Sequence, residues 1–66
     1  MEELVDKLID YLMKIPIMNK EMMIGIIGRF KTKEQCQEFL AWIQKQNLET
    51  IKEETMLIKA KQIMKT

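Results

Sequence analysis

The segment 22–28, Met-Met-Ile-Gly-Ile-Ile-Gly, has no charged or polar side chain and constrains the fold more than any other stretch. As a helix it would be apolar on every face, and such a helix has to be buried by its neighbours. A strand is the alternative for a run rich in isoleucine, but the chain contains no second strand-like segment to pair with it. We therefore predict that amphipathic helices cover this segment.

The residues before this segment have the spacing of an amphipathic helix. Leucine or isoleucine recurs at positions 4, 8, 12 and 15, and charged residues occupy the opposite side. Pro16 disfavours helical geometry at the residue before it and has no N–H to donate. These features predict a first helix over residues 2–15.

The apolar segment itself is predicted to lie in a second helix over residues 20–29. Asn19 precedes this helix and is a residue type that favours the N-cap position. The helix contains Gly25 and Gly28, and glycine costs up to ~1 kcal/mol relative to alanine in a helix interior. We consider two explanations: Gly25 allows a neighbouring helix to approach closely, and Gly28 ends the helix in the left-handed conformation.

Two capping-box patterns predict the remaining helices. The two patterns are residues 32–35, Thr-Lys-Glu-Gln, and residues 50–53, Thr-Ile-Lys-Glu. In a capping box the side chain of the first residue accepts a hydrogen bond from the amide of the fourth, and the side chain of the fourth accepts one from the amide of the first. The two patterns place a third helix over 33–46, with the clearest apolar period of the chain, and a fourth over 51–65. Because the connections are short, we expect consecutive helices to pack as neighbours.

The expected fold is therefore all-α, with four short helices packed around the apolar second helix in one domain, residues 1–66. A chain of 66 residues is near the lower limit at which one hydrophobic core can hold a fold together.

The composition argues against catalysis and metal binding. The chain has no histidine, so no side chain titrates near neutral pH without a perturbed environment. Cys36 has no histidine to activate it and falls on the apolar side of the third helix, where a thiol acts as a small hydrophobe. Zinc lacks its nitrogen and sulfur ligands. We predict no enzyme, no cofactor, no metal and no small-molecule substrate.

The net charge and the single cysteine indicate in which cellular compartment the protein works. The formal net charge is +1, which draws the chain neither to nucleic acid nor to anionic lipid. The longest uncharged run is far shorter than the ~20 residues of a membrane-spanning helix. One cysteine forms no internal disulfide, and the acidic first residues do not resemble a secretory signal. We expect a cytoplasmic protein that does not bind membranes.

The chain holds more large apolar side chains than four short helices can easily cover, including seven methionines, which suit adaptable binding surfaces. A contiguous apolar patch marks a protein interface. We predict a small protein–protein interaction module that binds itself, as a homodimer, or another protein. The predicted contact residues are Trp42, Tyr11, Met13 and Ile58.

A helix-turn-helix DNA-binding regulator is the alternative, because the second and third helices have suitable order and length. Its phosphate contacts would be Arg29, Lys31, Lys33 and Lys45. The outer face of the third helix, however, sums to neutral and contains no arginine, the commonest reader of bases. Nucleic acid is therefore the less favoured partner.

Overall fold

Four α-helices form the computed structural model, which describes residues 2–65. They are α1 (Glu2–Met13), α2 (Lys20–Ile27), α3 (Lys33–Ile43) and α4 (Glu53–Met64). No strand occurs within the described range. The predicted all-α class and the number of helices are confirmed.

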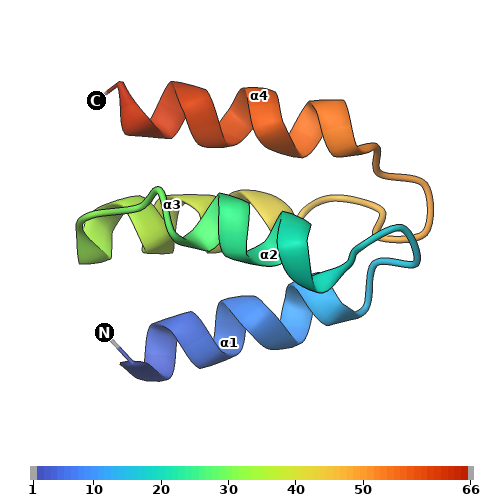
Figure 1. Cartoon of the computed structure of the whole chain (residues 1–66), viewed down its shortest axis with the longest axis horizontal. Coiled ribbons are helices and arrows are strands. Elements are labelled where there is room, and N and C mark those ends of the chain that lie inside the picture. Colours follow the sequence, from blue (N-terminus) through green and yellow to red (C-terminus); the bar gives the residue numbers. More distant parts are fainter. Residues whose placement is uncertain (1, 66) are drawn as a thin grey trace.

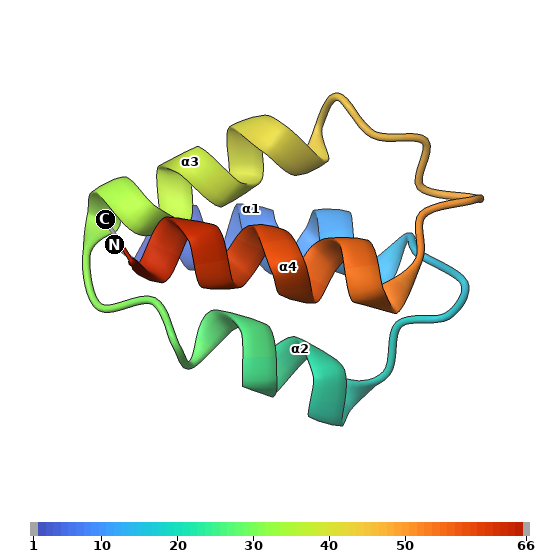
Figure 2. The ribbon, with the colours of Figure 1, turned by 90° about the horizontal axis from the view of Figure 1, so that it is seen from above.

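The helices run back and forth along the longest axis of the molecule (Figure 1). Seen at right angles, α2 and α3 lie on opposite sides of the molecule, with α4 above α1 between them (Figure 2). The most extensive contact joins α1 and α3, followed by α3 with α4, and then α1 with α2. The expectation that all consecutive helices pack together is wrong for α2 and α3, which the 28–32 connection carries to opposite sides.

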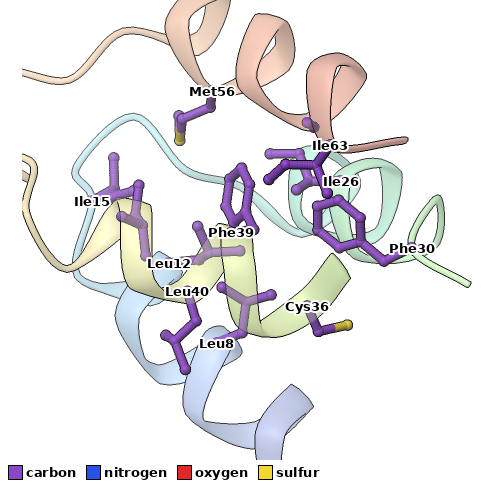
Figure 3. Packing of buried hydrophobic residues seen from close by; sticks show 12 residues of the cluster. Leu8, Leu12, Ile15, Ile26, Phe30, Cys36, Phe39, Leu40, Met56 and Ile63 are labelled. Carbon is purple, nitrogen blue, oxygen red and sulfur yellow. The ribbon is translucent and has the colours of Figure 1, made fainter. Parts of the chain in front are cut away.

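The core is built around α3, which buries four side chains: Cys36, Phe39, Leu40 and Ile43. The Phe39 side chain lies at the centre, with Leu8 and Leu12 of α1 on one side and Met56 and Ile63 of α4 on the other (Figure 3). The Phe39 side chain is fully buried, and the centre of its ring lies 5.4 Å from the centre of the Phe30 ring. Burying one such side chain is worth about 1.5–3 kcal/mol.

The apolar second helix is not the centre of the fold, and that part of the prediction is wrong. Within α2 only Ile26 is buried, whereas Ile24 is 61% exposed. A helix of only eight residues buries little more than one of its sides in the core. α2 packs mainly on α1. The centre of the fold is instead α3, whose apolar residues recur at helical spacing and place the large Phe39 on its buried side.

The first three helices end two or three residues before their predicted ends. Beyond Met13, and beyond the cap residues Gly28 and Gln44, the backbone continues in tight turns, with hydrogen bonds to the third residue back rather than the fourth. The amide of Ile15, for example, donates to the carbonyl of Leu12 at 3.1 Å. Such turns keep the chain compact beyond a helix end, so the apolar spacing continues where the helix does not.

Two predicted N-caps are confirmed. The Asn19 side chain accepts a hydrogen bond from the amide of Met22 at 2.9 Å. At α3 the Thr32 hydroxyl accepts from the amide of Gln35 at 3.2 Å, while the Gln35 side chain accepts from the amide of Thr32 at 3.3 Å. Each bond satisfies an amide that the helix leaves free.

The second predicted capping box is wrong. α4 begins at Glu53, with Lys52 at the N-cap position and no side-chain cap. Asn47 organises the preceding connection: its side chain accepts from the amide of Glu49 at 3.0 Å, and its carbonyl accepts from the amide of Ile51 at 3.0 Å. Because the amides of residues 49–51 are part of this turn, the helix begins only after them.

Both explanations offered for the glycines are also wrong. Gly25 is exposed, and a Cβ placed on it would meet nothing within 4 Å, so no helix approaches there. Gly28 has φ −64° in the right-handed region, so it is not a left-handed cap. A Cβ on Gly28 would instead lie 2.7 Å from the carbonyl oxygen of Ile24, because the last turn of α2 is tight.

The two capping predictions can be tested with one substitution made at two sites. Thr32→Ala removes a hydroxyl that caps α3 and should lower the free energy of unfolding by about 1 kcal/mol. Thr50→Ala, the matched control, removes a hydroxyl that caps no helix and should change it by less than about 0.5 kcal/mol. Urea unfolding followed by circular dichroism measures both, and equal losses would contradict the observed start of α4.

The glycines predict opposite effects of the same change. Gly25→Ala adds a methyl group in open space within a helix and should stabilise the fold by about 0.5–1 kcal/mol. Gly28→Ala forces the backbone near Ile24 to move and should destabilise it by about 1 kcal/mol or more. Urea unfolding of the two variants beside the unchanged chain gives both signs, and stabilisation by Gly28→Ala would show that this turn relaxes freely.

Candidate interaction surface

A hollow of about 240 Å³ lies between α1 and α2 and is lined by apolar atoms. Its walls are formed by Ile9 of α1 and by Met23, Ile24, Ile27 and Gly28 at the end of α2. Gly28 has no side chain, so the backbone forms that part of the wall. An apolar hollow without polar groups suits another apolar side chain better than a polar metabolite.

Helical spacing explains why apolar groups gather there. On α1, Leu8 and Leu12 point to the core, and Ile9 and Met13 form the adjacent stripe, one turn apart. Met13 does not line the hollow itself, but it is 65% exposed and lies one turn beyond Ile9 on the same side of α1. We call the six residues Ile9, Met13, Met23, Ile24, Ile27 and Gly28 the α1–α2 face.

The α1–α2 face includes the most exposed large apolar side chains of the described residues, Met13 at 65% and Ile24 at 61%. Single exposed apolar residues are ordinary on protein surfaces. Here Ile24 lines an apolar hollow, and Met13 lies one helical turn from Ile9, which also lines it. The arrangement can therefore accept an apolar partner surface.

Charges border this face unevenly. On α1 the exposed carboxylates of Asp6 and Asp10 follow the outer side of the Ile9–Met13 stripe. On α2 the exposed ammonium of Lys20 lies at the start of the helix, which carries the positive end of the helix dipole. Glu21 is exposed beside Lys20 in the same turn. The α1 edge of the face is therefore acidic, whereas the α2 edge carries both charge signs where α2 begins.

The structure does not bring the four predicted contact residues together. Met13 is part of the α1–α2 face, but Tyr11 lies about 200° around α1 from it. Tyr11 is half-buried, with the Lys14 ammonium 5.0 Å from the centre of its ring. Ile58 is 58% exposed on α4, on the side opposite the buried Met56 and Ala60.

Trp42, the fourth predicted contact, is half-buried against the core. Its ring centre lies 5.5 Å from that of Phe39, and its carbonyl accepts a hydrogen bond from the Gln46 side chain at 3.2 Å. Much of its area is therefore already used within the chain. Its role as a contact residue stays a prediction.

Sequence reasoning missed most of the α1–α2 face because it placed the second helix in the centre. One signal could have found it. A helix apolar on every face needs neighbours on every side, and this chain has only three further helices among its described residues. Three neighbouring helices cannot cover every side of α2, so part of it has to face solvent.

The cations of the alternative prediction do not form one site. Arg29, Lys31 and Lys33 are exposed around the α2–α3 connection, whereas Lys45 follows the far end of α3, about 18 Å along the helix axis. In addition, α2 and α3 lie on opposite sides of the molecule (Figure 2), unlike the packed pair of a helix-turn-helix.

A second hollow, of about 280 Å³, lies between α1 and α3. It is lined by Glu3, Leu4, Lys7, Lys33 and Gln37. Except for half-buried Leu4 these residues are exposed, and both charge signs are present. Such solvated, mixed charges select no particular class of ligand.

Two observations concern metal binding and nucleophilic chemistry in the described residues. No group of three histidine, cysteine, aspartate or glutamate side chains in residues 2–65 could hold a metal ion. Cys36 is 1% exposed, and burial raises the pKa of its thiol above the ordinary value because the thiolate would lose its hydration. A buried thiol of this kind is a poor nucleophile.

Comparisons with protein-family models, with curated proteins and with solved structures find no match to this chain. None of the helices in the described range is long and apolar enough to cross a membrane.

Burial of Cys36 predicts slow alkylation and an alkaline loss of stability. The raised pKa of the thiol favours the folded state below about pH 8.5, the value of an exposed thiol, and this contribution disappears as pH rises through the folded pKa. Iodoacetamide should label the folded chain much more slowly than the chain in urea. Between about pH 8 and 10, Cys36→Ala should lose less stability than the unchanged chain. Equal pH profiles would contradict this role of burial.

Proposed function

We propose that this chain is a small, non-enzymatic protein–protein interaction module that works in a reducing, cytoplasmic setting. Its binding surface is the α1–α2 face, and its partner is another protein or a second copy of the chain. The free, buried thiol of Cys36 suits a reducing compartment.

One observation carries the proposal: Ile24, which is 61% exposed, lines a hollow formed by apolar atoms. Met13, which is 65% exposed, lies one helical turn beyond Ile9 of the same lining. Exposed apolar area in water costs about 25 cal/mol per Å², so covering it favours association. Met23 on the same surface is a flexible side chain that adapts its shape to a partner.

The DNA-binding alternative has less support. Lys45 lies far from the other three cations, and α2 and α3 are not packed against each other as recognition requires. It stays open to direct measurement of duplex binding at low salt, where phosphate contacts are strongest.

Site-specific photo-crosslinking in cells of the source organism tests the proposed surface. A photoreactive side chain in place of Ile24 should give a discrete protein adduct, because a partner covers this position. The same group in place of Ile58, which is equally exposed at 58%, is the matched control and should give none. The adduct's mass distinguishes a second copy from another protein.

No adduct from Ile24, or equal adducts from both positions, would contradict the α1–α2 face as the binding surface. An adduct from Ile58 alone would favour the original contact prediction on α4 instead.

A further inference from the structure

We draw no further inference here: the strongest candidate, the apolar hollow between α1 and α2 with the exposed side chain of Ile24 on its wall, belongs to the binding surface already proposed, and nothing in the structure shows what covers it.

Discussion

Burial of Phe39 between α1 and α4 is the interaction on which the rest of the structure depends. Its ring lies against Phe30 and Trp42 at 5.4 and 5.5 Å between ring centres, so segments from both sides of the molecule meet at one residue. Because a chain of 66 residues buries little surface, it has few kcal/mol of stability to distribute. Placing the largest buried side chain on α3 makes that helix the one that the others must contact.

The position of α2 follows from this constraint. With α3 in contact with both α1 and α4, the short second helix packs mainly against α1 and turns Ile26 inwards. Its remaining isoleucines and methionines are partly or largely exposed. Under the proposed function, the same packing produces both the fold and its binding surface. The apolar side chains that the core does not bury lie where a partner can cover them. Binding would then also stabilise the fold by mass action.

Much of the fold could be predicted because its signals are local. Asn19 and the Thr32–Gln35 pair cap helices through atoms within three residues of one another, so the sequence contains all that the contact needs. The helix ends were less accurate, because turns with hydrogen bonds to the third residue back carry the same apolar spacing as a helix. Thr50 failed as a cap because Asn47 organises the backbone around it, and the capping-box pattern does not include that competitor.

The sequence by itself determined that four helices form and which side of α1, α3 and α4 is apolar, since period and caps depend on neighbours along the chain. Only the tertiary structure decided which helix is central and which apolar residues stay exposed. Ile24 and Ile26 are the same side chain two positions apart, yet one is 61% exposed and the other 0%. Their difference depends on which helices lie beside α2, and that is fixed by long-range packing around Phe39. The candidate surface was therefore beyond the reach of local patterns.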